Sequence, residues 1–170
     1  MQERKGVVTF QGNPLTLRGG ELKVGDKAPP FTLLNNQLQP VAMDAYRGKT
    51  LLLSVAPSLD TPVCAIQTRK FNQELKNLPP FTALVTVTAD LPFAQGRFCG
   101  AEGLTITTLS DHKDMSFGDA YGTHISELRL ETRALFVVGK DGLLKYVQYV
   151  KEITQEPDYA PALAALKANA

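Results

Sequence analysis

The sequence has little of what ties a protein to a membrane or to nucleic acid. Its 18 lysines and arginines nearly balance 17 aspartates and glutamates, the net charge is +1, and neither sign collects in a block. A nucleic-acid-binding domain normally carries a clear basic patch. The longest apolar runs have the length of a strand and fall short of a membrane span. We therefore expect neither a nucleic-acid nor a membrane partner.

Soft metal ligands and secretory features are equally scarce. The chain has only Cys64, Cys99, His112 and His124, and no pair has the spacing of a zinc site. Met1 is followed by charged residues instead of an apolar signal core. We expect a cytoplasmic protein without metal or cofactor, with both histidines in loops or on the surface. In a reducing compartment a cysteine pair favours catalysis over a structural disulfide.

The 170 residues suffice for one sizeable core but not for two ordinary domains. We therefore expect a single domain over residues 1–170, with strands and helices alternating in an α/β fold. The N-terminus predicts a β-hairpin at about residues 7–17, and Asp158 is expected to cap a last helix through Lys167. The other expected strands are 31–34, 50–56, 82–89, 105–109, 133–138 and 143–150, and the other expected helices are 62–78, 93–102 and 117–121.

Cys64 is the most informative residue. It follows the buried-strand pattern 51–56 and the loop 57–61, and it falls in the first turn of the expected helix. Unpaired N–H groups and the positive end of the helix dipole both favour a thiolate there, which is the nucleophilic form. Thr61, three residues earlier, can cap the helix or bring its hydroxyl near the sulfur. Asp60 is a second candidate for the cap. Pro57 adds a rigid surface that has no backbone N–H to donate.

The spacing of Pro57, Thr61 and Cys64 matches P-x-x-x-T-x-x-C, the active-site signature of the peroxiredoxins. The longer run SVAPSLDTPVC, the segment ADLPFAQGRFC at 89–99 and the segment EITQEPDY at 152–159 resemble the thiol peroxidase subfamily, a group of atypical two-cysteine peroxiredoxins. The similarity extends from about Val8 to the C-terminal helix. It implies a thioredoxin-like fold, with a central mixed sheet flanked by helices and an added N-terminal hairpin.

The resemblance also implies roles for individual residues. Cys64 matches the peroxidatic cysteine, which reduces hydrogen peroxide and organic hydroperoxides. Cys99 matches the resolving cysteine, although its pattern alone favours core packing. Arg133 matches an active-site arginine, whereas the residues alone also allow a pair with Glu131 or Asp60. Family members commonly form homodimers, and the implied reductant is a thioredoxin-like dithiol.

Two other functions use similar chemistry. A thioredoxin-type reductase needs C-x-x-C, but Ala65, Ile66 and Gln67 follow Cys64. A non-enzymatic redox sensor would use the same cysteine pair, so the sequence leaves that alternative open. Cys64 and Cys99 are expected on separate helices, and a disulfide requires Cα atoms within about 7 Å. We therefore expect both helices to open locally before the two sulfurs can join.

Overall fold

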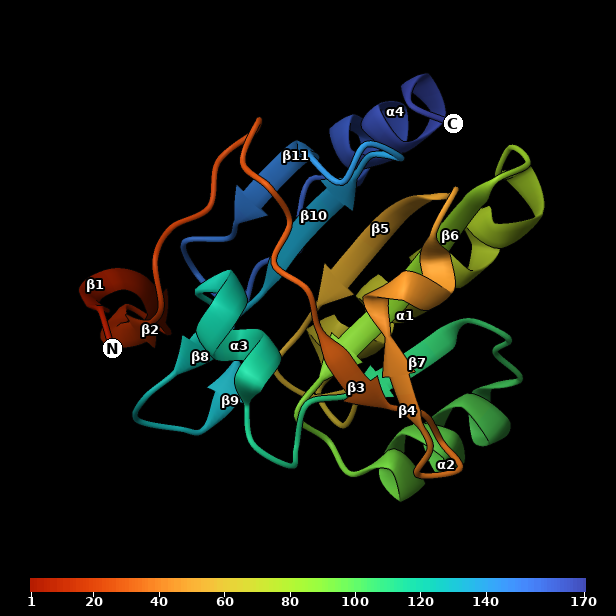
Figure 1. Ribbon diagram of the computed structural model, residues 1–170. Coiled ribbons are helices and arrows are strands. Elements are labelled where there is room, and N and C mark those ends of the chain that lie inside the picture. Colours follow the sequence, from red (N-terminus) through yellow and green to blue (C-terminus); the bar gives the residue numbers. More distant parts are fainter.

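The computed structural model describes all residues 1–170 and contains a seven-stranded mixed sheet in the order β11-β10-β5-β6-β7-β3-β4 (Figure 1). β5, β6 and β7 are parallel, and β10 joins β5 in antiparallel orientation. This confirms the expected α/β class with a mixed sheet. The strands of this sheet are β3 (Thr32–Leu34), β4 (Pro40–Ala42), β5 (Thr50–Val55), β6 (Thr82–Thr88), β7 (Thr107–Ser110), β10 (Ala134–Val138) and β11 (Leu144–Tyr149).

The centre of the sheet consists of strands that are covered on both faces. Every residue of β5 and of β10 is buried, as expected for continuous apolar runs between two layers. β10 and β11 form the expected C-terminal hairpin. The site described below lies where β5 ends and β10 begins, so it rests on the most rigid strands of the molecule.

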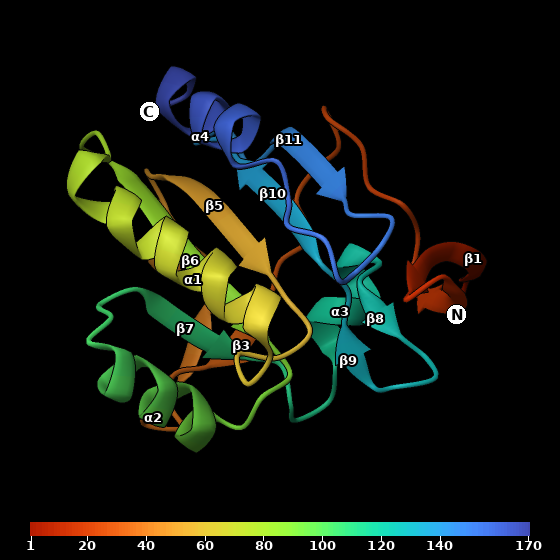
Figure 2. The same ribbon diagram turned by 180° about the vertical axis from the view of Figure 1, so that it is seen from behind.

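Three helices cover one face of the sheet, as Figure 2 shows: α1 (Pro62–Glu74), α2 (Pro92–Glu102) and α4 (Tyr159–Ala168). Phe71 of α1 and Leu166 of α4 pack with Leu52 and Leu135 of the sheet in one apolar cluster. The short α3 (Ser116–Tyr121) packs on the opposite face, where Phe117 and Tyr121 stack at 4.2 Å between ring centroids. The core therefore has two halves, one on each side of the sheet.

A second sheet of four strands, in the order β1-β2-β8-β9, flanks the end of the main sheet. β1 (Glu3–Phe10) and β2 (Asn13–Arg18) form the expected N-terminal hairpin, longer than predicted. Its turn residues Gln11 and Gly12 both have positive φ, 51° and 80°, as a two-residue hairpin turn requires. β8 (His124–Ile125) and β9 (Leu130–Glu131) complete this sheet and had no signal in the sequence.

Several local expectations are wrong. The helix expected over 62–78 is α-helical only to Glu74 and continues as a 3-10 turn, Leu75–Asn77. Asp158 precedes α4 but does not cap it, because its carboxylate accepts a hydrogen bond from Gln148. His124 is buried instead of exposed, with Nδ1 2.7 Å from Asp119 Oδ1. No helix combines the length and apolar character needed to cross a bilayer.

Candidate functional site

Cys64 lies in the first turn of α1, immediately beyond the loop that leaves the central strand β5. Pro62 occupies the start of the helix, where its missing N–H costs nothing. The Cys64 side chain is fully buried. The position is the predicted one, with first-turn N–H groups and the helix dipole favouring a thiolate.

Arg133 donates from Nη2 to the Cys64 sulfur at 3.3 Å. Its side chain is 2% exposed, and none of the ion pairs in the protein includes it. The alternative in which Arg133 pairs with Glu131 or Asp60 is therefore wrong. A buried guanidinium without an anion is costly. Among the partners of this guanidinium, only the Cys64 sulfur belongs to a group that can carry a negative charge.

Two groups that sequence reasoning missed hold the guanidinium in place. The Ile153 carbonyl accepts from Nε at 3.0 Å and from Nη2 at 2.8 Å, and Gln67 Oε1 accepts from Nη1 at 2.6 Å. Gln67 is itself fixed by donating to Ser54 Oγ at 2.7 Å, on β5. A polar residue three positions after Cys64 shares its helical face, which was an available signal. Together with the bond to sulfur, these contacts use four of the five N–H donors of Arg133.

The N-terminal hairpin positions the Ile153 carbonyl. The Ile153 N–H donates to the Thr9 carbonyl at 2.9 Å, and the Thr9 N–H donates to the Lys151 carbonyl at 2.7 Å. Between them, the Glu152 carboxylate accepts from the N–H groups of Thr154 and Gly12, and these bonds lower its pKa to about 2. The added hairpin is thus part of the support of the arginine.

Thr61 is the residue before α1, but its side chain does not cap the helix. Its hydroxyl donates to the Ser58 carbonyl at 2.8 Å, so the capping expectation is wrong. The side chain is exposed and lines a pocket beside Arg133, and the buried Pro57 lines the same pocket. The hydroxyl oxygen keeps lone pairs for a group that enters the pocket.

This pocket has a volume of about 500 Å³ and a largely apolar wall. The wall comes from four places: the loop before Cys64 with the start of α1, the N-terminal hairpin, β9 with the turn before it, and the segment that contains Ile153. A molecule with a small polar end and an apolar body fits such a surface, its polar end toward Arg133. The apolar lining residues are Phe10, Pro57, Pro62, Val63, Leu128, Leu130 and Ile153.

Cys99 lies apart from this pocket, in α2. It is 7% exposed and packs in the apolar cluster between α2 and the sheet. Burial raises the pKa of the Cys99 thiol, and a hydrogen bond with Thr108 opposes this only in part. Both cysteines are free thiols on intact helices. Cys99 is therefore an unreactive thiol as long as α2 stays folded.

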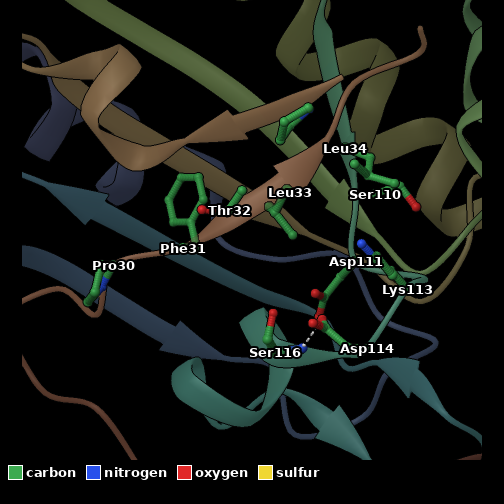
Figure 3. Close-up of a pocket in the computed structure, with 11 residues that line it drawn as sticks. Pro30, Phe31, Thr32, Leu33, Leu34, Ser110, Asp111, Lys113, Asp114 and Ser116 are labelled. Carbon is green, nitrogen blue, oxygen red and sulfur yellow. Dashed lines mark hydrogen bonds between the residues drawn. The ribbon is translucent and has the colours of Figure 1, made fainter. Parts of the chain in front are cut away.

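A second pocket, of about 450 Å³, lies between β3 and the start of α3 and contains none of the predicted site residues (Figure 3). Asp111 lines it and accepts hydrogen bonds from the N–H groups of Phe117 and Gly118. Behind it, Glu131 is wholly buried, and its Oε1 has no partner except the Asp111 carboxyl. Burial and the neighbouring Asp111 raise the pKa of Glu131 well above its ordinary value.

The family model named Redoxin matches residues 23–163. A thiol peroxidase from Halalkalibacterium halodurans is 56% identical over 95% of this chain and 97% of its own length. The chain belongs to the thiol peroxidase subfamily of the peroxiredoxins. A thiol peroxidase from Bacillus subtilis is 49% identical to this peroxiredoxin over 95% of the chain and 96% of its own length.

Solved structures agree with this assignment. A peroxiredoxin-like protein from Aquifex aeolicus superposes with a TM-score of 0.90 at 36% identity, covering 97% of this chain and 98% of that one. A thiol peroxidase from Chromobacterium violaceum has the same fold, with a TM-score of 0.84 at 20% identity. The thioredoxin-like fold implied by the sequence is confirmed.

The structure brings four of the five predicted site residues of this peroxiredoxin together. Pro57, Thr61 and Arg133 line one pocket, and Cys64 bonds Arg133, while Cys99 packs between α2 and the sheet. The arrangement combines a buried cysteine sulfur, a fixed cation beside it and an apolar pocket that the same cation lines.

Proposed function

We propose that Cys64 is the peroxidatic nucleophile of this thiol-dependent peroxidase. Its thiolate attacks the terminal oxygen of a hydroperoxide in line with the O–O bond. The Cys64 sulfur takes that oxygen as a sulfenic acid, and the remaining oxygen leaves, once protonated, as water or an alcohol. The observation that carries the proposal is the buried Arg133 guanidinium, which bonds the sulfur at 3.3 Å and has no carboxylate partner.

The other pocket residues support the same reaction. The N–H of Arg133 left without a protein partner can bond the peroxide oxygens and stabilise the negative charge that develops on them. The Thr61 hydroxyl accepts a hydrogen bond from the bound hydroperoxide, and Pro57 lines the same pocket without adding a competing donor. Hydrogen peroxide and organic hydroperoxides both satisfy these contacts.

Cys99 completes the cycle in this proposal. After α1 and α2 open locally, Cys99 attacks the Cys64 sulfenic acid and forms an intramolecular disulfide. A thioredoxin-like dithiol then reduces the disulfide by exchange. We also propose that the protein works in the cytoplasm and as a homodimer, in line with the resemblance to thiol peroxidases.

Steady-state peroxide reduction with thioredoxin, thioredoxin reductase and NADPH tests the proposal. Cys64→Ser should abolish turnover, because a serine hydroxyl stays protonated near neutral pH. Wild-type protein should turn over many equivalents of peroxide, whereas a sensor would consume one equivalent and stop. Sustained activity of Cys64→Ser would show that another group is the nucleophile.

A further inference from the structure

One carboxylate, that of Asp90, joins the loop before Cys64 to the segment before the Cys99 helix. Asp90 Oδ1 accepts from the Ser58 hydroxyl at 2.6 Å. Oδ2 accepts from the Leu59 N–H at 2.8 Å and from the Thr88 hydroxyl at 2.8 Å. β5 and β6 are parallel neighbours, so the loops that follow them lie at the same edge of the sheet (Figure 2). Asp90 follows β6 directly and therefore bridges the two loops.

On the Cys64 side, the contact continues through Ser58. Its hydroxyl oxygen accepts from the Asp60 N–H at 3.2 Å, and its carbonyl accepts the Thr61 hydroxyl at 2.8 Å. Thr61 is the residue immediately before α1. The geometry of Ser58, and with it the helix start that carries Cys64, depends on the Asp90 carboxylate.

On the Cys99 side, the contact continues through Thr88 to the buried Gln95 of α2. Gln95 Nε2 donates to Thr88 Oγ1 at 2.9 Å and to the Leu109 carbonyl at 2.9 Å. Gln95 lies one helical turn before Cys99 and shares its buried face. The same carboxylate thus stabilises the folded positions of both segments.

A pocket of about 400 Å³ separates the two segments, with Ser58, Leu59 and Asp90 on one side and Ala94 and Phe98 of α2 on the other. Both segments can move into this space without first displacing the sheet. The ion pair between α1 and α2, Arg69 with Glu102 at 2.8 Å, lies farther along the two helices.

We propose that Asp90 is a positioning residue for the resolving step: its carboxylate holds the Cys64 loop and the Cys99 helix folded together, and its release frees both. The inference rests on the roles proposed for Cys64 and Cys99. In the resolving step the Cys99 thiol loses its proton, the S–S bond forms, and the S–O bond of the Cys64 sulfenic acid breaks. The hydroxide leaves with the proton as water, and no external oxidant or reductant takes part. Where release is slow, a second peroxide instead oxidises the sulfenic acid to sulfinic acid.

Asp90→Asn tests the proposal with almost no change in shape. The asparagine side chain has an NH₂ group in place of one of the two carboxylate oxygens. Both oxygens of Asp90 accept hydrogen bonds, from Ser58, Leu59 and Thr88, so at least one of these donors loses its acceptor. Loss of a hydrogen bond to a charged group changes an equilibrium by roughly tenfold or more. We expect disulfide formation to be roughly tenfold faster, and Cys64 sulfinic acid to require a correspondingly higher peroxide concentration.

Two measurements distinguish this role from general destabilisation. Mass spectrometry should show Cys64 shifted from sulfinic acid to disulfide at each peroxide dose. Hydrogen exchange of the reduced protein should rise together in residues 57–64 and 91–102, while β5 and β10 stay protected.

Ser58→Ala, which removes one of the three donors, should shift both readouts in the same direction by a smaller factor. Asp60→Asn is the matched control, because the Asp60 carboxylate is exposed and accepts no hydrogen bond, and it should change neither readout.

The outcomes are separable from those of the proposed function. If wild-type protein forms the Cys64–Cys99 disulfide but Asp90→Asn and Ser58→Ala leave its rate and the sulfinic acid yield unchanged, the Asp90 role is refuted. Exchange that rises in only one segment, or over the whole sheet, also refutes it. If wild-type protein forms no such disulfide, the proposed function fails instead.

Discussion

Replacement of Arg133 by lysine keeps the positive charge and removes the planar array of donors. The guanidinium contacts three groups in different directions: the Ile153 carbonyl, Gln67 Oε1 and the Cys64 sulfur. A lysine ammonium is a compact group with three donors at one atom, on a flexible stem. One ammonium cannot bond all three of these groups and also present a donor to the peroxide. We expect Arg133→Lys to fold and to react slowly with peroxide.

The magnitude follows from the number of donors lost. The three ammonium donors can replace the contacts to Ile153, Gln67 and the sulfur, which leaves no donor for the peroxide. A hydrogen bond to a charged group contributes about 1.5–3 kcal/mol, and about 1.4 kcal/mol corresponds to a factor of ten. One such loss predicts a peroxide reaction slower by roughly 10 to 10².

Stopped-flow mixing of the reduced variant with one equivalent of peroxide measures this rate without the recycling steps. Arg47→Lys is the control, because Arg47 is exposed and bonds only the neighbouring Asp44. A folded Arg133→Lys protein that reacts at the wild-type rate would show that the guanidinium geometry does not matter.

Three further changes test separate parts of the site. Cys99→Ser should react once with peroxide and then overoxidise without recycling through thioredoxin, and recycling at the wild-type rate would exclude Cys99 as the resolving residue. Thr61→Val should slow the peroxide reaction by roughly tenfold, because it removes one hydrogen bond and no charge, and a wild-type rate would exclude the hydroxyl from the reaction. Glu131→Gln should flatten the dependence of stability on pH. The pKa of Glu131 is raised by burial, so the stability it gives is present below its ordinary pKa of 4.5 and is lost as pH rises toward the folded value. Denaturant unfolding at several pH values measures this, and a wild-type free energy of unfolding that does not fall with pH relative to Glu131→Gln would contradict it.

The sequence was most informative where local patterns determine the structure. The continuous apolar run of β5 and the alternation of strands and helices predict a covered mixed sheet, and Gln11 and Gly12 predict the hairpin turn. The position of Cys64 in the first turn of α1 followed from Pro62 and the preceding strand. These features depend on neighbours within a few residues.

The contacts that complete the site depend on distant segments and had no local signal. The Ile153 carbonyl reaches Arg133 because β1 hydrogen-bonds to residues 151–153. The backbone carbonyl of an apolar residue cannot be recognised as a ligand from its sequence. Phe10 and Leu128 enter the pocket wall only because β1, β2, β8 and β9 join in a second sheet. Two of those strands are two residues long, too short to give a periodic pattern.

The division of contacts around Arg133 explains how a site can open at every turnover and still close accurately. Resolution in the proposed cycle displaces Cys64 with the start of α1, and this removes the contact to the sulfur. The two bonds to the Ile153 carbonyl do not involve α1, because that carbonyl belongs to the segment held by the N-terminal hairpin. The Arg133 carbonyl also accepts the Val150 N–H at 2.9 Å, next to β11, so its backbone is fixed at the junction of the two sheets. In this proposal the cation stays in place while the sulfur moves, and after reduction the Cys64 sulfur returns to the same buried donor.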